Sequence, residues 1–220
     1  MRENLDVLAA CTLFEGVSRE DMAAMLQCMQ ARVVDVPKGG AVFRADGPAE
    51  YVGILLSGGV VVLRDDFDGN RAIQAAMRPG DLFGETFACA GVSRLPVSVE
   101  ADRPSRVLLI RLKQIIETCP SACGFHNRVV LNLLKVLAAK NLMLNGKLEI
   151  TSRRTTRDKL LAYLSAQARA AGSDSFVIPF DRQGLADYLG VDRSALSAEI
   201  GKLRREGVLE SYRSAFRLLR

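Results

Sequence analysis

The stretch GLADYLGVDRSALSAEIGKLRREG, residues 184–207, predicts two short helices separated by a tight turn. Asp181 is placed to cap a first helix that ends at Gly190, because glycine readily adopts the left-handed backbone conformation found after a helix. Asp192 is placed to cap the second helix. This spacing is typical of a helix-turn-helix.

The second helix, expected to end near Glu206, has two distinct faces. Leu196, Ile200 and Leu203 recur at helical spacing and should face the core. The opposite face is small at its start and basic at its end, which suits entry into the major groove of DNA. The residues expected on or beside this face are Arg193, Ser194, Ser197, Ala198, Gly201, Lys202 and Arg205. Arg193, in the first turn, is the best-placed candidate for a bidentate contact to guanine.

The charge distribution supports the same interpretation. Residues 1–150 hold 17 Lys and Arg against 17 Asp and Glu, whereas residues 151–220 hold 13 against 8, so the net charge of +5 lies in the last part of the chain. Such a segment favours a polyanion partner through counterion release. Residues 208–220 read as a β-hairpin, the wing of a winged helix. A helical hairpin packed on a neighbouring element, with a merely soluble basic surface, is the alternative.

The residues between Ala31 and Leu112 predict β-structure. The hydrophobic period changes to two, and seven or eight short strands are separated by glycine turns at 38–40, 57–59, 68–70 and 79–80. This pattern predicts an antiparallel roll or barrel. Before it, Ser18 and Asp21 form a capping box for a helix that should pack on the roll.

A long helix is expected over about residues 121–150. Its apolar stripe consists of Val130, Leu133, Leu137, Leu144 and Leu148. A helix of about 25 residues is about 37 Å long, more than a small roll covers, so we expect the leftover part of the stripe to pack against the same helix of a second copy. Packing wholly on its own domain is the alternative. Thr155 and Asp158 cap the next helix, which places a domain boundary near residue 150 and predicts an α+β chain with domains 1–150 and 151–220.

Composition narrows the class of protein. An uninterrupted apolar run of about 18 residues and a signal peptide are both missing, and five scattered cysteines suit a reducing compartment, so a cytoplasmic location is expected. One histidine is too few for the metal site of a cupin enzyme, which needs two or three. Neither paired carboxylates nor a phosphate-binding glycine loop argues for another enzyme class, so none is expected.

The whole chain resembles transcription regulators of the cyclic-AMP receptor protein and FNR (CRP/FNR) family. The resemblance rests on the glycine-punctuated roll, PGDLFGE at 79–85, the long helix, and RQGLADYLGVDRSALSAEIGKLRREGVL at 182–209. It implies a β-roll of cyclic-nucleotide-binding type, a dimerising helix and a winged helix that binds a palindromic operator in double-stranded DNA. RNA polymerase is a candidate partner.

The resemblance also assigns roles to single residues. Arg182 and Gln183 stand where the family has a phosphate-contacting pair, and Arg193 stands where it has a base-reading arginine. Ser194 replaces a frequent glutamate and Ala198 a frequent arginine, so the operator is expected to differ from the family's best-known consensus sites.

The same resemblance places an effector at GETFACAGVSRLPVSVEA, residues 84–101. Gly84 and Glu85 match residues that meet a ribose, but Leu95 and Pro96 occupy the places of the Arg-Ser pair that holds a cyclic phosphate, and Arg94 falls one residue early. Burying a phosphate without its charge partner costs several kcal/mol, so cyclic AMP is not expected unless a shortened loop returns Arg94 to the pocket. Leu144 and Asn145 replace adenine-contacting hydroxyl residues, which favours a less polar effector. The candidate effector-binding residues are Gly84, Glu85, Thr86, Arg94, Leu95, Pro96 and Val97.

Two other functions stay open. Cys89, Cys119, Cys123 and His126 carry groups that bind zinc or iron-sulfur clusters, which gives a redox or metal sensor as an alternative. Their spacing is weak, and buried structural thiols are commoner. The other alternative is a ligand-sensing module that does not bind DNA. Neither the effector nor the direction of regulation can be read from the sequence.

Overall fold

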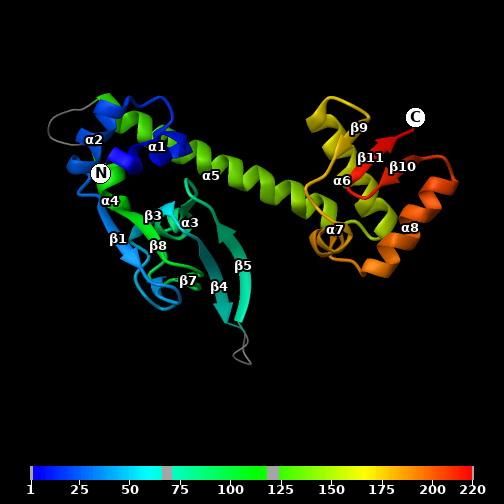
Figure 1. Cartoon of the computed structure of the whole chain (residues 1–220), viewed down its shortest axis with the longest axis horizontal. Helices are drawn as coiled ribbons and strands as arrows, with labels where there is room; N and C mark the ends of the chain where they lie inside the picture. Colours follow the sequence, from blue (N-terminus) through cyan, green and yellow to red (C-terminus); the bar gives the residue numbers. More distant parts are fainter. Residues whose placement is uncertain (1, 66–70, 118–123, 220) are drawn as a thin grey trace. The chain divides into compact units, whose positions relative to one another are not determined.

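The computed structural model describes residues 2–65, 71–117 and 124–219 (Figure 1). The chain divides into two compact units, Met1–Ala139 and Lys140–Arg220. The first begins with α1 (Arg2–Ala10), the 3-10 helix η1 (Thr12–Phe14) and α2 (Arg19–Cys28), and it continues with β1 (Arg32–Val36), β2 (Ala41–Phe43), β3 (Tyr51–Ser57), β4 (Val60–Asp65), β5 (Arg71–Met77), β6 (Leu82–Phe83), α3 (Glu85–Cys89), β7 (Ser98–Ala101), β8 (Ser105–Arg111) and α4 (Leu112–Ile116).

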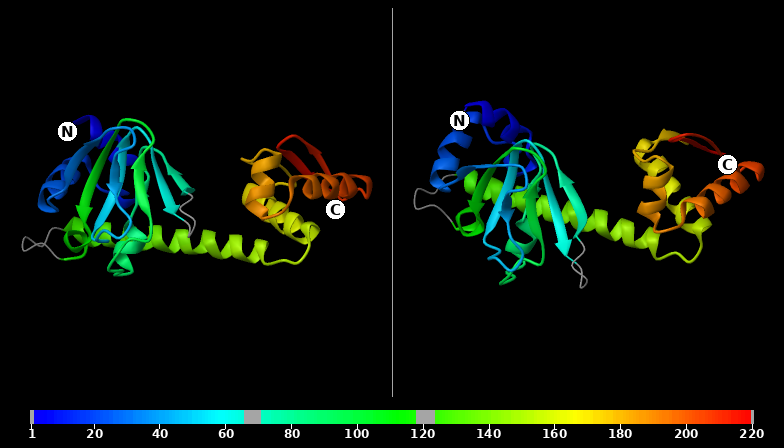
Figure 2. Two further views of the ribbon diagram at one scale, coloured as in Figure 1. Left: turned by 90° about the horizontal axis from the view of Figure 1, so that it is seen from below. Right: turned by 60° about the horizontal axis from the view of Figure 1, so that its bottom comes forward.

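The first unit is built on two antiparallel sheets, ordered β1-β8-β3-β6 and β2-β7-β4-β5 (Figure 2). Alternating side chains of both sheets, among them Leu55, Val60, Val99 and Val107, meet in one apolar cluster. The other face of the first sheet packs against the N-terminal helices. The predicted antiparallel roll and the capping of α2 by Ser18, which accepts a hydrogen bond from the Asp21 amide at 3.1 Å, are confirmed. The predicted turn at 68–70 lies outside the described residues.

The long helix α5 runs from Gly124 to Thr151. The roll covers the first half of the predicted stripe, because Leu133 is buried and packs with Leu137 on the core of the roll. The second half of the stripe, Leu144 and Leu148, is exposed. By length and composition, α5 is also the one helix in the described residues apolar enough to span a membrane.

Polar side chains fix the first half of α5. Asn132 is buried and donates hydrogen bonds to the carbonyl oxygens of Leu13 at 3.1 Å and Glu15 at 2.9 Å. His126 is also buried, and its Nε2 lies 3.0 Å from the Gln114 carbonyl oxygen. These contacts hold one face of α5 against the N-terminal segment and α4.

The second unit contains α6 (Thr156–Ala171), β9 (Ser175–Val177), α7 (Arg182–Leu189), α8 (Arg193–Arg205), β10 (Leu209–Tyr212) and β11 (Ala215–Leu218). Its three strands form one antiparallel sheet in the order β10-β11-β9. The strand predicted at FVIPF begins one residue earlier and ends before Pro179, which has no amide hydrogen for a sheet. Thr155 accepts the predicted capping bond from the Asp158 amide at 3.0 Å.

The core of the second unit reaches into the end of α5. Ile150 is buried there with residues such as Leu160, Leu185 and Leu203. This contact explains why the compact units divide between Ala139 and Lys140, inside α5. The domain boundary expected near residue 150 stays a prediction.

Candidate nucleic-acid interface

Two aspartates and a glycine build the helix-turn-helix. The Asp181 carboxylate accepts a hydrogen bond from the Gly184 amide at 2.7 Å, and Gly190 ends α7 with a left-handed φ of 61°. The Asp192 carboxylate accepts hydrogen bonds from the amides of Ser194 at 2.8 Å and Ala195 at 3.0 Å. A hydrogen bond from the Ser194 hydroxyl, together with these amides, lowers the pKa of Asp192. The Asp192 carboxylate therefore stays ionised at neutral pH, and its negative charge interacts favourably with the positive end of the α8 dipole.

The recognition-type helix α8 presents the face that the sequence predicts. Leu196, Ile200 and Leu203 are buried in the core of the unit. The predicted DNA-facing residues of α8 are exposed: Arg193, Ser194, Ser197, Ala198, Lys202 and Arg205. Small side chains followed by cations therefore lie on a surface that a duplex can reach.

The two predicted residues of α7 differ in their surroundings. The Gln183 side chain is exposed, and its amide donates to Asp187 at 2.8 Å. The Arg182 guanidinium is half-buried and lies 5.7 Å from the centre of the Phe216 ring on β11. Burial lowers the pKa of Arg182 from its ordinary value, although an arginine stays charged at neutral pH.

The wing completes this surface. Pairing of β10 with β11 brings Ser211, Tyr212 and Arg213 beside Ser197 and Arg204 of α8, around a hollow of about 310 Å³. The wing residues and Arg204 were not among the residues that the sequence predicted to contact DNA. The only local signal was the hairpin pattern at 208–220, which does not reveal which helix the wing covers.

Arg157 of α6 forms ion pairs with two glutamates on one side of α8. The Arg157 guanidinium donates to Glu206 at 2.6 Å and lies 3.5 Å from Glu199. The two glutamates are seven residues apart, so they share one side of the helix. The hydrogen bond from Arg157 is the main cause that lowers the pKa of Glu206.

The candidate effector region centres on the start of α3 in the roll. Gly84 has a φ of 81°, and a Cβ placed there would lie 2.8 Å from the Phe43 ring and 2.9 Å from the Tyr51 carbonyl oxygen. Only glycine fits this conformation and this close approach without strain. Glu85 is buried and accepts a hydrogen bond from the Thr86 hydroxyl at 2.9 Å.

The four remaining effector candidates alternate in exposure. Leu95 and Val97 are buried, whereas Arg94 and Pro96 are exposed. The Leu95 amide donates to the Gly47 carbonyl oxygen and its carbonyl accepts from the Asp46 amide, both at 2.9 Å. In this arrangement the buried positions are apolar and the Arg94 charge lies in solvent.

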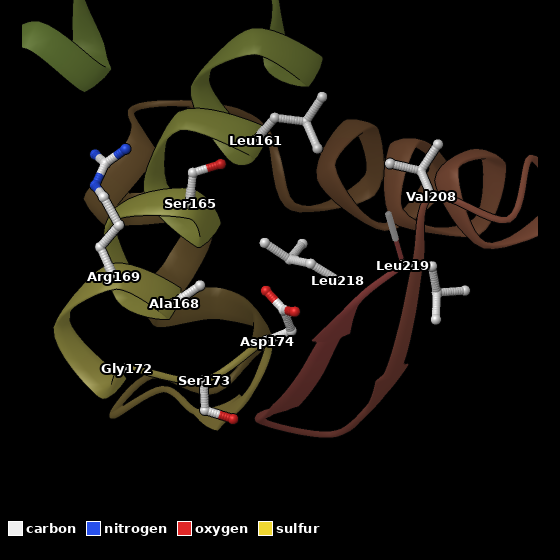
Figure 3. Close-up of a pocket in the computed structure, with 10 residues that line it drawn as sticks. All are labelled: Leu161, Ser165, Ala168, Arg169, Gly172, Ser173, Asp174, Val208, Leu218 and Leu219. Carbon is white, nitrogen blue, oxygen red and sulfur yellow. The ribbon is translucent and has the colours of Figure 1, made fainter.

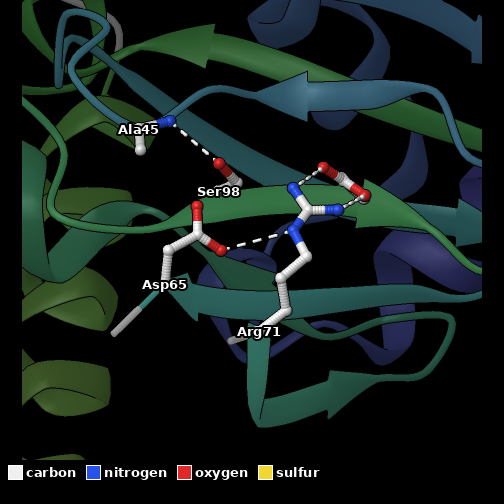
Figure 4. A network of polar contacts seen from close by, with 5 residues as sticks. Ala45, Asp65, Arg71 and Ser98 are labelled. Carbon is white, nitrogen blue, oxygen red and sulfur yellow. Dashed lines mark hydrogen bonds and ion pairs between the residues drawn. The ribbon is translucent and has the colours of Figure 1, made fainter. Parts of the chain in front are cut away.

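In the second sheet of the roll, ion pairs of one arginine link β5 with β4 and β7 (Figure 4). Arg71 on β5 donates to both carboxylate oxygens of Glu100 on β7, at 2.7 and 3.0 Å, and to Asp65 on β4 at 3.3 Å. The Ser98 hydroxyl accepts from the Ala45 amide at 3.0 Å. Since Arg71 has these three acceptors, its charge is already compensated.

The described residues give little support to the alternative of a redox or metal sensor. Cys119 and Cys123 lie outside them, and no group of three metal-ligating side chains is found among the rest. Partial desolvation of its thiol raises the pKa of Cys89, whose residue surface is otherwise exposed, and the charge of Glu85 adds to the shift. Burial raises the pKa of the Cys11 thiol. A raised pKa leaves less of the reactive thiolate at neutral pH.

A further hollow of about 720 Å³ lies in the second unit between α6, the loop after it and the end of β11 (Figure 3). Leu161, Val208 and Leu218 give it apolar walls, and Arg169 and Asp174 lie at its edge. None of the residues predicted to bind DNA lines it.

Comparison with known proteins matches both units. A model of the cyclic nucleotide-binding domain matches residues 33–121, and a model of the Crp-like helix-turn-helix domain matches residues 158–220. The CRP-like cAMP-activated global transcriptional regulator of Mycobacterium tuberculosis is 35% identical over 80 residues, which are 36% of this chain and 35% of that protein. The match thus spans about a third of the length of that regulator.

Two further relatives cover nearly the whole chain. The nitrogen fixation regulation protein FixK of Azorhizobium caulinodans is 25% identical over 217 residues, 93% of this chain and 83% of that protein. The crystal structure of the Thermus thermophilus catabolite activator protein is similar with a TM-score of 0.51 and 21% identity, covering 94% of this chain and 93% of that one. This last likeness concerns the fold.

Proposed function

Because this chain belongs to the CRP/FNR family of transcription regulators, we propose that it is a homodimeric, sequence-specific DNA-binding regulator whose roll senses a small effector. The observation that carries the proposal is the exposed face of α8, where small polar side chains lead to cations. Arg193, Ser194 and Ser197 are assigned to base edges, with Ala198 against the groove. Arg182, Gln183, Lys202 and Arg205 are assigned to phosphates.

Dimerisation through α5 is supported by an exposed seam. Leu131, Leu134, Ala138, Asn141, Asn145 and Leu148 alternate at spacings of three and four residues and are all exposed. Such a seam pairs with its own copy as a two-stranded coiled coil. The Asn145 side chain donates to Asn141 at 2.7 Å, so two of the seam positions are polar and can fix the register.

The effector is proposed to bind in the roll at Gly84, Glu85, Thr86, Leu95 and Val97, with Arg94 and Pro96 at the edge. Buried apolar positions support a ligand less polar than cyclic AMP. Bound effector would favour the arrangement in which the two copies of α8 lie one turn of DNA apart. The protein would act in the cytoplasm and meet RNA polymerase at the promoters it binds.

Selection from a randomised pool of duplexes tests the proposal. The full-length protein should enrich a palindrome with half-sites about one helical turn, about 10 base pairs, apart. Arg193→Ala should cost about 1 to 3 kcal/mol of binding free energy on the selected site and relax one position in each half-site. Arg169→Ala, which removes an exposed cation of α6, is the control.

Two outcomes oppose different parts of the proposal. Equal loss on every duplex would show that Arg193 does not read a base. A wild-type protein that enriches no sequence and binds no duplex would rule out DNA-binding regulation and leave the ligand-sensing module.

A further inference from the structure

The hydroxyl of Ser194, the second residue of α8, is held by the residue that caps the helix. Ser194 Oγ donates a hydrogen bond to Oδ1 of Asp192. The same oxygen accepts hydrogen bonds from the amides of Ser194 at 2.8 Å and Ala195 at 3.0 Å. One carboxylate oxygen therefore restrains both the backbone and the side chain of Ser194.

The direction of the hydroxyl bond follows from the charge of Asp192. An ionised carboxylate only accepts hydrogen bonds, whereas a serine hydroxyl has one proton to donate and two lone pairs that accept. The hydrogen bonds from Ser194 and Ala195 lower the pKa of Asp192, so this carboxyl group is ionised at neutral pH. The one proton of the Ser194 hydroxyl is therefore directed at Asp192, and only the lone pairs of Oγ are left for a ligand.

Ser197, three residues further along α8, provides a contrast. It is exposed, as Ser194 is, and both are assigned to base edges. Within the part of the chain that the structure describes, Ser197 Oγ forms no hydrogen bond. Its hydroxyl can rotate, so it can donate to one base or accept from another. The two serines thus carry the same group but offer different hydrogen bonds to DNA.

We propose that Asp192 determines base specificity through Ser194, because it limits Ser194 Oγ to accepting a hydrogen bond from an exocyclic amino group in the major groove. Cytosine presents its N4 amino group there and adenine its N6 amino group, whereas guanine presents the acceptor O6 and thymine the acceptor O4. Two acceptors facing each other leave both without a donor, which is unfavourable in a desolvated interface. The inference rests on the proposed function and adds Asp192 to it as a positioning residue.

Two variants of Asp192 separate its acceptor oxygen from its role as a cap. Asp192→Gly removes the oxygen, although glycine caps a helix nearly as well, and Asp192→Asn keeps both an acceptor oxygen and the cap. Selection from a randomised pool of duplexes first identifies the operator position at which Ser194→Ala loses its base preference. Fluorescence anisotropy then gives the affinity for four duplexes that differ only in the base at that position.

The wild type should prefer cytosine or adenine over guanine and thymine at this position by about 5-fold or more. Asp192→Asn should keep most of this preference, because its side-chain oxygen still accepts the Ser194 proton. Asp192→Gly should reduce the preference to less than about 2-fold, because the freed hydroxyl can then also donate to O6 or O4.

The operator position that Ser197→Ala relaxes is the matched control. Base preference there should be the same in the wild type, Asp192→Asn and Asp192→Gly, since Asp192 does not hold the Ser197 hydroxyl. Equal loss of preference at both positions in Asp192→Gly would show that Asp192 acts only by capping α8, which overturns the inference.

The remaining outcomes separate this inference from the proposed function. A wild type that prefers guanine or thymine at the Ser194 position, or an Asp192→Gly variant that keeps the preference for an amino base, would overturn the inference. It is also overturned if Ser194→Ala relaxes no position of the operator. Failure of the wild type to bind any duplex would instead overturn the proposed function itself.

Discussion

At the scale of single residues, Tyr163 is the polar group whose burial has the clearest consequence. Its side chain on α6 is 2% exposed, and its hydroxyl has no hydrogen-bond partner among the described residues. The ring packs against Tyr188 at 5.2 Å and Phe180 at 6.3 Å between ring centres. Burial, with a smaller effect of Tyr188, raises the pKa of Tyr163 to about 12.

Tyr163→Phe is therefore expected to stabilise the second unit by about 1 kcal/mol, because it removes a buried hydroxyl without a partner and keeps the ring packing. In the wild type, the folded state favours the neutral phenol of Tyr163. The stability of the wild type that depends on this preference is complete below pH 10.0 and is lost as the pH rises towards about 12. Chemical denaturation of both proteins at neutral and alkaline pH checks the prediction. The gap between Tyr163→Phe and wild type should widen at alkaline pH.

Tyr212→Phe is the matched control, since that phenol is exposed and should tolerate loss of its hydroxyl at either pH. A gap that stays constant with pH would mean that Tyr163 ionises as easily in the folded chain as in the unfolded chain.

At the scale of elements, the orientation of α8 depends on its flank as well as on its buried face. Arg157 lies in the first turn of α6 and neutralises Glu199 and Glu206 on one side of α8. Without Arg157, two carboxylates of a DNA-facing helix would repel the phosphates of a duplex. The pKa of Glu206 is lowered, so this pairing is present above the ordinary carboxyl pKa and is lost as the pH falls through the folded-state value.

Arg157→Ala should weaken binding to all duplexes by a few-fold at low salt and by less at high salt, since salt screens exposed charges. Adding Glu199→Gln and Glu206→Gln to Arg157→Ala should restore most of the affinity. Anisotropy titrations at two salt concentrations measure both effects. If the triple variant stays as weak as Arg157→Ala, the arginine acts through packing and not through its charge.

At the scale of the whole molecule, the uncovered surface of α5 is the feature that the single chain does not explain. Leu131 and Leu134 are 58% and 56% exposed although Leu133 between them is buried in the roll. Two apolar faces on one helix segment imply two partners, of which the chain itself supplies one.

Replacing Leu131 and Leu134 together by glutamate should convert the proposed dimer into a monomer, because four carboxylates would meet at the seam. Sedimentation measures the mass, and operator affinity should fall by at least about 100-fold because each half-site then binds alone. Met143→Glu, on an exposed apolar residue that lies away from the seam, should leave the dimer intact. A protein whose mass and affinity do not change would show that α5 pairs through another face or not at all.

The sequence alone determined the order of the N-terminal helical segment, the roll, the long helix and the helix-turn-helix, because the signals for them are local. The short helices α3 and α4 were not predicted. Ser18, Thr155, Asp181 and Asp192 cap the predicted helices through bonds to amides two or three residues away. Period-two patterns with glycine turns likewise predicted the roll. The exposed face of α8 followed from helical geometry once Leu196, Ile200 and Leu203 were placed inside.

Only the tertiary structure decided which surfaces cover one another. It showed that Leu133 of α5 belongs to its own roll, that Leu95 is buried while Arg94 is exposed, and that Arg182, Arg204 and Arg213 line one hollow. Residues 182 and 213 are 31 positions apart, and no local pattern records that the hairpin folds back beside α8. Such contacts depend on how the packed core orients whole elements, which a periodicity of 2 or 3.6 residues cannot specify.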